Sequence, residues 1–419
     1  MARPIFVFCL LTAIAAAQAP QPLTAEQAVD EAVANNLELT AQKLSVTVAQ
    51  AAEITARLRP NPVLTVSGQT LNVLGATYSP DTPLGPNQFN LHTDFPVERG
   101  HKRQERIALA REDTSLAQLG VRELMRQLIA AVQAGYVEVQ QAKENLNLAR
   151  ENLKSLDGVV AVNEARVRSG DLAVVELDRS RVAALQYAAA VRQAELALAQ
   201  AKTRLQQLMG RAARSQEFDV AGDMRRQDSL PTPEEILRLA LLRRPDYLAS
   251  QQTQTRSRAD LRLQLANGKF DYSLGTEYTH QSAWGASGSS MGFYFSMPLP
   301  VFNRNQGEIA RAQREINLTG ARIRSVEASI ASEIEQAHRQ CTVSRLLLTG
   351  IEQDMLGKAR SVRDITEYSY RRGEATLVEF LDAQRAFNDA SMAFNEARAS
   401  YAKSLYQIDA VSGATVAGK

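Results

Sequence analysis

The chain has 419 residues, of which 45% are hydrophobic, 22% charged and only 6% aromatic, and its formal net charge is +2. This hydrophobic share excludes gross disorder, and the near-neutral charge gives no broad electrostatic case for binding nucleic acid. The prolines are more informative, because none lies between 97 and 230 and none follows Pro300. Since the turns of compact α/β enzymes recruit proline, these two stretches predict very long helices.

The first residues are typical of a secretory signal peptide. Arg3 supplies a basic start, an apolar stretch follows, and Ala17-Gln18-Ala19 has the form of a cleavage site. An N-terminal membrane anchor is the alternative, but the apolar stretch is shorter than the roughly 20 residues that a span requires. We therefore expect residues 1–19 to be removed. Cys9 lies inside the stretch and not at the cleavage point, so we expect no lipid anchor.

The rest of the chain repeats one plan. Gly170-Asp171 and the residues after it match Gly373-Glu374 and its followers, and similar matches occur earlier in the chain. A repeat of about 200 residues is too long for a solenoid unit. We interpret it as the duplication of a whole half, giving repeats over 20–230 and 231–410 and a flexible tail over 411–419.

Each repeat is predicted to begin with a helix, over 24–57 in the first and over 232–265, with a break at Pro245, in the second. Two short strands follow, and then a long helical hairpin. The hairpins are expected over 101–209 (helices 101–167 and 174–209) and over 304–409 (helices 304–370 and 376–409). Apolar residues recur every seven positions, as in Val132, Val139 and Leu146, which favours coiled-coil packing.

The four strands are predicted over 63–71, 88–95, 271–279 and 291–297. Apolar and polar residues alternate in them, so that Phe89, Leu91 and Phe95 share one face while Asn90 and His92 share the other. This pattern is typical of outer-membrane barrel strands, although a half-buried soluble hairpin also produces it. The joining segments 72–87 and 280–290, rich in Gly, Pro, Ser and Asn, favour the membrane interpretation because they could form extracellular loops.

Four strands cannot close a barrel, and open sheet edges are not tolerated in lipid. A chain that spans a membrane in this way must therefore oligomerise. Three subunits would supply twelve strands, while two or four subunits remain arithmetically possible.

With this arrangement the chain resembles the TolC family of outer-membrane efflux channels over about residues 23–410. The resemblance rests on the duplication, the paired strands, the long helices and the two glycine turns. The segments Glu98–Arg106 and Val175–Arg179 are more similar to the heavy-metal branch typified by CzcC. The resemblance implies a mainly α fold with a small β part. Duplicated coiled-coil hairpins would form an α-barrel, and four strands per chain would join a trimeric, twelve-stranded transmembrane β-barrel.

The implied function is that of an exit duct. The resemblance implies a homotrimer in the lipid of the bacterial outer membrane with a long periplasmic extension, docked through a periplasmic adaptor onto an inner-membrane pump of the RND type. Such a duct is not an enzyme. Metal cations or small toxic compounds are the candidate cargo. The alternatives are the outer-membrane channel of a type I secretion system and a periplasmic coiled-coil scaffold.

The two glycine turns are the first candidate site. Glycine ends helices because it adopts positive φ, which explains the glycines but not the similarity of their flanking residues. The resemblance implies that these tips contact the adaptor. The residues concerned are Arg168, Gly170, Asp171, Arg372, Gly373 and Glu374.

The second candidate site is the channel aperture. Glu379 and Asp382 are three residues apart and so share one helical face; the resemblance implies that they face the channel axis, together with Glu176 and Tyr370. A ring of such carboxylates favours cations, and their mutual repulsion raises their pKa values. The alternative is that both are ordinary helix-start acids.

The family also has a basic residue in its gate, and Ala375 stands at that position here. Whether Arg371 or Arg372 replaces it stays open.

We expect no catalytic residue, metal site or cofactor, because the chain has no HExxH, CxxC, G-x-S-x-G or phosphate-loop motif. His338 and Cys341 could share a helix face, but two ligands are too few for a closed zinc site. One further feature has two interpretations. A basic cluster after the second strand either contacts anionic lipid head groups or is a solvated helix start. It consists of Arg99, His101, Lys102, Arg103 and Arg106.

Overall fold

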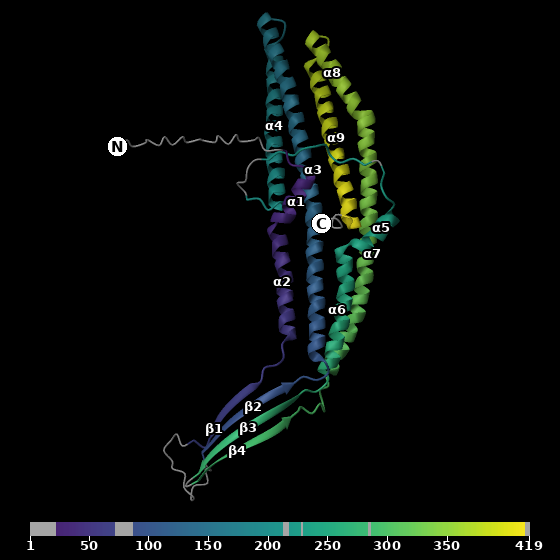
Figure 1. Cartoon of the computed structure of the whole chain (residues 1–419). Helices are drawn as coiled ribbons and strands as arrows, with labels where there is room; N and C mark the ends of the chain where they lie inside the picture. Colours follow the sequence, from purple (N-terminus) through teal and green to yellow (C-terminus); the bar gives the residue numbers. More distant parts are fainter. Residues whose placement is uncertain (1–21, 72–86, 213–217, 228, 284–285, 415–419) are drawn as a thin grey trace, which may run out of the picture. The chain divides into compact units, whose positions relative to one another are not determined.

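The computed structural model describes residues 22–71, 87–212, 218–227, 229–283 and 286–414 (Figure 1). These residues form long helices and one four-stranded sheet, with the same order of elements in both halves of the chain. The predicted mainly α fold with a small β part is confirmed. The predicted signal peptide over 1–19 lies outside the described residues. No described helix is both long and apolar enough to cross a membrane.

The chain divides into two compact units, and each takes segments from both predicted repeats. The first unit comprises the residues up to Asn36 with Gln127–Leu230 and Ala337–Asp409. The second comprises Leu37–Arg126, Pro231–Gln336 and the residues from Ala410. α3 (Lys102–Ser169), α7 (Gln306–Gly350) and α9 (Leu377–Ser412) contribute to both units.

Two antiparallel hairpins make up most of the first unit. α3 pairs with α4 (Val174–Leu208), and ion pairs such as Glu164–Arg181, 2.8 Å, join the two helices. α8 (Leu356–Arg372) pairs with α9, where the Arg363 guanidinium lies 4.1 Å from the ring centroid of Phe387. In Figure 1 each of the two hairpins ends in a tight turn. The apolar seven-residue repeat is buried, as expected: Val132, Val139 and Leu146 are all core residues.

The helix predicted over 24–57 is two helices. α1 (Ala25–Asn35) begins at a capping box formed by Thr24 and Gln27, and α2 (Leu37–Arg57) follows after one residue. Asn36 breaks the helix because its backbone is extended, with ψ 123°, and its side-chain amide donates to the Leu208 carbonyl at 3.0 Å. The continuous prediction was wrong at this residue.

The second repeat has the same break where it was expected. α5 (Pro233–Arg243) and α6 (Pro245–Asn267) are separated by Arg244, whose ψ is 121°. Proline at the first position of α6 fits a helix start, because its missing N–H would have no intrahelical partner there.

The helix predicted over 304–370 is also interrupted. After α7 the chain makes a π-helical turn, η1 (Ile351–Met355), before α8 begins. A π-turn accommodates an extra residue within a helix. Gly350 and Gly357 flank this turn, and Glu352 within it accepts a hydrogen bond from Arg226 at 3.1 Å.

The second unit holds the sheet, whose strands pair antiparallel in the order β1-β2-β3-β4. The strands are β1 (Val63–Gln69), β2 (Asn87–Val97), β3 (Tyr272–Ala283) and β4 (Ala286–Ser296). The long loop expected over 280–290 is wrong, because most of it is strand: Gln281 pairs with Gly288, and Ser282 with Ser287. Small polar residues are compatible with a ladder that is held by backbone hydrogen bonds.

The flexible tail expected over 411–419 is wrong for its first residues, while residues 415–419 lie outside the described residues. α9 continues to Ser412, and Val411 is only 1% exposed. Gly413, with φ +73°, ends the helix in close contact with Arg243 and the backbone of Arg244. A side chain at Gly413 would meet this backbone, so the close packing holds the end of α9 in place.

Candidate functional site

The two tip turns have the same geometry. Gly170 has φ +84° and Gly373 has φ +82°. At the first turn the Asp171 N–H donates to the Arg166 carbonyl at 2.8 Å, and at the second the Glu374 N–H donates to the Ser369 carbonyl at 2.9 Å. These are the 6→1 bonds of a Schellman motif, which satisfies the last carbonyls of a helix. Glycine is therefore required locally at both turns.

Replacing Gly170 with alanine is expected to destabilise the tip by about 1 kcal/mol, because a β-carbon is strained at positive φ. The measurement is amide hydrogen exchange followed by mass spectrometry. Peptides across the turn should exchange roughly fivefold faster than in the wild type.

The matched control for this turn is Gly158→Ala. Gly158 lies inside α3, where an added β-carbon would meet only the Arg371 guanidinium at 3.8 Å. Alanine is favoured over glycine in a helix interior, so exchange there should slow or stay unchanged. Equal acceleration in both variants would contradict the role assigned to the turn.

The predicted tip residues differ in how far their side chains are engaged. Asp171 accepts a hydrogen bond from the Ser169 hydroxyl at 2.7 Å. The Arg372 guanidinium lies 4.6 Å from the ring centroid of Tyr368. Arg168 and Glu374 are exposed, and their side chains form no hydrogen bond or ion pair with any other described residue. A charged group of each sign is therefore available at the tips.

Arg166 joins the two turns, a contact that no sequence pattern indicated. Its Nη1 donates to the Tyr370 carbonyl at 3.4 Å, and a β-carbon placed on Gly373 would come within 2.8 Å of its Nη2. The first hairpin thus contacts the turn of the second through this guanidinium. The duplication could not indicate this contact, because Ser369 occupies the corresponding position in the second repeat.

Tyr370 is a core residue of the paired hairpins. Its hydroxyl donates to Asn163 Oδ1 at 2.8 Å, and its ring stacks on Phe380 with centroids 5.8 Å apart. Burial raises the pKa of this phenol. Glu176, which was expected beside it in the aperture, accepts from Arg179 at 2.7 Å. Within the described residues the two side chains are not hydrogen bonded to each other, so their joint role in the gate stays a prediction.

Glu379 caps the start of α9. It accepts from the Thr376 backbone N–H at 2.7 Å and from the Thr376 hydroxyl at 2.9 Å, and its own N–H donates back to that hydroxyl at 3.3 Å. These are the reciprocal bonds of a capping box. They lower the pKa of Glu379, the backbone bond most, where repulsion in a ring was expected to raise it. The helix-start interpretation therefore holds within one chain.

Asp382 follows on the same exposed side of α9. Its carboxylate lies 3.8 Å from the Arg385 guanidinium, and both side chains are mostly in solvent. Arg371, one of the two candidates for the missing basic residue, donates to Glu367 at 2.6 Å. The other candidate, Arg372, rests on Tyr368. Both acids of the predicted ring thus remain accessible from outside this chain.

Pairs of amide side chains fix how α3 lies against α9. Asn152 accepts from Gln384 and donates to Asn388, both at 2.8 Å, while Asn395 donates to Asn145 at 2.9 Å. Asn152 and Gln384 are fully buried. Since a buried amide must find its partner, such pairs specify the register of packed helices. The seven-residue spacing of the asparagines on each helix is the sequence signal that could have predicted this ladder.

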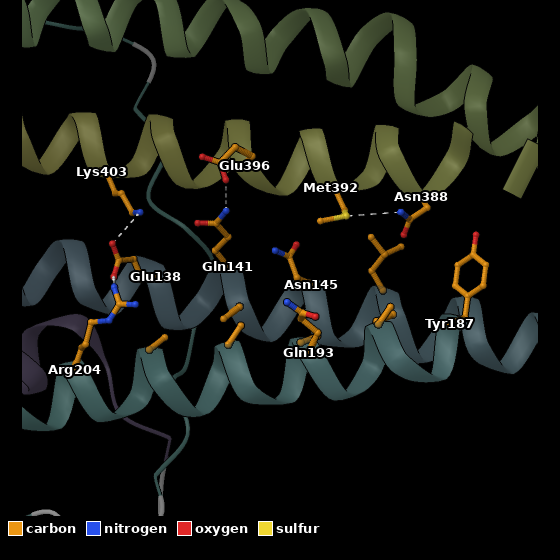
Figure 2. Close-up of a pocket in the computed structure, with 17 residues that line it drawn as sticks. Glu138, Gln141, Asn145, Tyr187, Gln193, Arg204, Asn388, Met392, Glu396 and Lys403 are labelled. Carbon is orange, nitrogen blue, oxygen red and sulfur yellow. Dashed lines mark hydrogen bonds and ion pairs between the residues drawn. The ribbon is translucent and has the colours of Figure 1, made fainter. Parts of the chain in front are cut away.

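A groove of about 660 Å³ lies beside this ladder and is lined by α3, α4 and α9 (Figure 2). Six of its lining residues are alanines. Figure 2 shows Glu138 between Arg204 and Lys403 at one end, with N–O distances of 3.6 and 3.3 Å. Glu138 offsets one of the two positive charges, so an ion-pair network with one excess positive charge borders this end of the groove.

The sheet separates apolar from polar side chains, as predicted. Its register aligns Leu91, Tyr278 and Met291 on one face, and all three are exposed. A second exposed row follows, made of Phe95, Leu274 and Phe295. No described segment covers these rows.

Polar side chains on the opposite face of the sheet bond to one another. His92 Nε2 lies 3.0 Å from Asp94 Oδ2, and its ring stacks on Tyr294 with centroids 4.2 Å apart. Asn90 accepts from the Thr279 hydroxyl at 2.9 Å. A sheet with an uncovered apolar face and a hydrogen-bonded polar face is the arrangement of a membrane barrel segment. Long helical hairpins combined with such a sheet define an outer-membrane channel protein.

Comparison with known proteins agrees with this class. Residues 28–211 and 236–414 match the sequence profile of the outer membrane efflux protein family, and the chain belongs to this family. The predicted resemblance to TolC-type channels is thereby confirmed. The role of the protein is efflux transport in the outer membrane.

Individual relatives share only about a quarter of their aligned residues with this chain. The chain is 24% identical over 368 residues to the cobalt-zinc-cadmium resistance protein CzcC of Cupriavidus metallidurans, covering 88% of this chain and 84% of that protein. It is 26% identical over 276 residues to the probable outer membrane lipoprotein SilC of Salmonella typhimurium, covering 62% of this chain and 57% of that protein. The match to CzcC agrees with the heavy-metal branch that the segments Glu98–Arg106 and Val175–Arg179 resemble.

The fold is shared with solved structures. The CmeC outer membrane channel of Campylobacter jejuni aligns with a TM-score of 0.76 over 93% of this chain and 85% of that chain, at 18% identity. At this identity the likeness establishes the fold alone.

Proposed function

We propose that three copies of this chain form the outer-membrane exit duct of a tripartite efflux pump. The observation that carries the proposal is the sheet. It has an uncovered apolar face, and its outer strands β1 and β4 each pair on one side only among the described residues. Lipid does not tolerate open edges. Three sheets joined edge to edge would close them in a twelve-stranded barrel and turn the polar face toward the lumen.

Exposed apolar stripes on the helices support association between copies. α2 exposes Leu37, Leu44 and Val48, which are spaced seven and four residues apart. α4 exposes Val182, Leu185 and Leu196 in the first unit. Stripes of this kind suit helix packing against a neighbouring subunit. A closed ring of three subunits would cover such stripes on every copy.

The tips would contact the periplasmic adaptor. Arg168 and Glu374 offer unpaired charges, and the two glycine turns hold them at the ends of the hairpins. Charged groups at the rim of an interface mainly set specificity and association rate. An inner-membrane pump of the RND type would then deliver cargo into the duct. Glu379, Asp382, Glu176 and Tyr370 would form the aperture through which that cargo passes.

For cargo, we propose metal cations or small toxic compounds. CzcC is named for resistance to cobalt, zinc and cadmium, and a ring of carboxylates favours cations. Export would use the signal peptide over 1–19, removed on secretion, with no lipid anchor.

Fractionation of cells tests the proposal. We expect the full-length chain in the outer-membrane fraction, released only by detergent, and a trimer after chemical cross-linking of the extracted protein. Recovery as a monomer from the periplasmic extract without detergent would instead support the coiled-coil scaffold. A detergent-extracted monomer or dimer would contradict the barrel of twelve strands.

A further inference from the structure

A cationic cavity of about 340 Å³ lies where the sheet passes into the helices of the second unit. Its walls come from three segments: the link between α2 and β1, the end of β2 and the start of α3. The lining residues are Arg59, Pro60, Pro96, Val97, Glu98, His101, Lys102, Arg103 and Gln104. The proposed function gives this cavity no role.

Two charges of the cavity are neutralised by protein partners. Lys102 is buried and its Nζ lies 2.7 Å from Asp271 Oδ2. Glu98 is held by Arg106, with Nη2 and Oε2 3.0 Å apart. Neither group is therefore available to a ligand, and Glu98 does not offset the remaining positive charge.

Arg59 and Arg103 remain without an anionic partner among the described residues, and they reach the cavity from different segments. His101, with φ +62°, also lines the cavity and can add a further donor. Guanidinium groups bind phosphate through paired, charge-assisted hydrogen bonds. The free charges of the cavity thus match a phosphate group.

The cavity is continuous with the apolar face of the sheet. Val97 lines the cavity. It lies on the same face of β2 as Phe95, Thr93 and Leu91, because alternate residues of a strand share a face. Leu64 of β1 pairs with Thr93 and lies on this face as well. A ligand that fills the cavity and covers these neighbours needs an anionic head and apolar chains. Inorganic phosphate would leave the apolar neighbours uncovered.

We propose that this cavity binds the phosphate of a phospholipid whose acyl chains lie along the apolar face beside Phe95. The proposal rests on the membrane placement of the sheet in the proposed function. The proposal also gives different roles to the members of the basic cluster that follows β2. Lys102 and Arg106 make internal contacts, and Arg99 lies 4.7 Å from the ring centroid of Phe270. Arg103, joined by Arg59 from a separate segment, contacts lipid.

The test compares the wild type with Arg59→Gln/Arg103→Gln by native mass spectrometry. The intact full-length protein in detergent micelles is titrated with phosphatidylglycerol. We expect the double variant to bind the lipid at least about tenfold more weakly, since each basic residue near a membrane surface contributes roughly a fivefold gain in affinity. The matched control is Arg111→Gln/Arg122→Gln, two exposed positions on α3 outside the cavity, which should bind as the wild type does.

Three results would overturn the proposal: equal lipid binding by wild type and cavity variant, equal loss in the control variant, or displacement of the lipid by millimolar inorganic phosphate. The last would assign the cavity to a free anion. Because binding is read in micelles, it is independent of cell fractionation. A chain found outside the membrane would refute the proposed function, whereas a membrane-inserted chain with unselective lipid binding would refute only the lipid site.

Discussion

Replacing Arg244 with methionine is expected to lower the free energy of unfolding by about 3 kcal/mol, because two carboxylates lose their shared cation. Arg244 is 2% exposed. Its Nε and Nη2 reach the two oxygens of Asp246 at 3.0 and 2.6 Å, and its Nη1 reaches Glu333 at 2.7 Å. This loss is at the low end of the range for a broken buried ion pair, because the Glu333 side chain is partly exposed to water.

The measurement is chemical denaturation of the detergent-solubilised protein, followed by circular dichroism. Arg238→Met is the matched control, because Arg238 is exposed on α5 and has no charged partner among the described residues. Its unfolding free energy should lie within about 0.5 kcal/mol of the wild type. Similar values for Arg244→Met and Arg238→Met would show that the buried network contributes nothing.

The same network predicts a pH dependence. Burial alone would raise the pKa of Asp246, but the hydrogen bonds from Arg244 outweigh it, and the pKa is lowered. A carboxyl with a lowered folded-state pKa stabilises the fold fully above its ordinary pKa of about 4, and the contribution is lost as the pH falls through the lowered value. The wild type should therefore lose more stability on acidification below pH 4 than Arg244→Met does.

Arg244 and Asn36 illustrate how much of the fold the sequence could predict. Both residues separate the first two helices of their repeat, with almost the same backbone angles. Proline after Arg244 made the second break visible, because proline favours the first position of a helix. Leu37 gives no such signal. The first break depends on the hydrogen bond from Asn36 to the distant Leu208 carbonyl, which local propensity does not report.

The candidate site was predictable to a similar degree. The glycines at 170 and 373 follow from helix-end chemistry, and the structure gives both the positive φ that was expected. The link through Arg166 was not predictable, because it depends on how one hairpin lies beside the other. The asparagine ladder is intermediate: its spacing is visible on each helix, but which asparagines meet depends on the tertiary register.

Neutralising the aperture acids with Glu379→Gln/Asp382→Asn is expected to reduce cation over anion selectivity roughly fivefold or more. In a trimer six carboxylates would surround the opening, and clustered charges at a narrow opening create potentials of several kT. The measurement is the reversal potential of single channels in planar bilayers under a salt gradient. Asp223→Asn/Glu234→Gln removes the same charge from exposed positions away from the start of α9 and should leave selectivity unchanged.

Single substitutions of Glu379 separate its two roles. Glutamine preserves the cap, because α1 of the same chain uses Gln27 in an equivalent capping box with Thr24, whereas alanine removes both the cap and the charge. If the charge acts on the permeating ion, Glu379→Gln and Glu379→Ala should shift selectivity equally, while only alanine destabilises α9. If selectivity changes with alanine alone, Glu379 is a helix cap and the ring of carboxylates is refuted. Because the bonds from Thr376 lower its pKa, Glu379 should also keep its effect on selectivity below the ordinary pKa of glutamate, about 4.3.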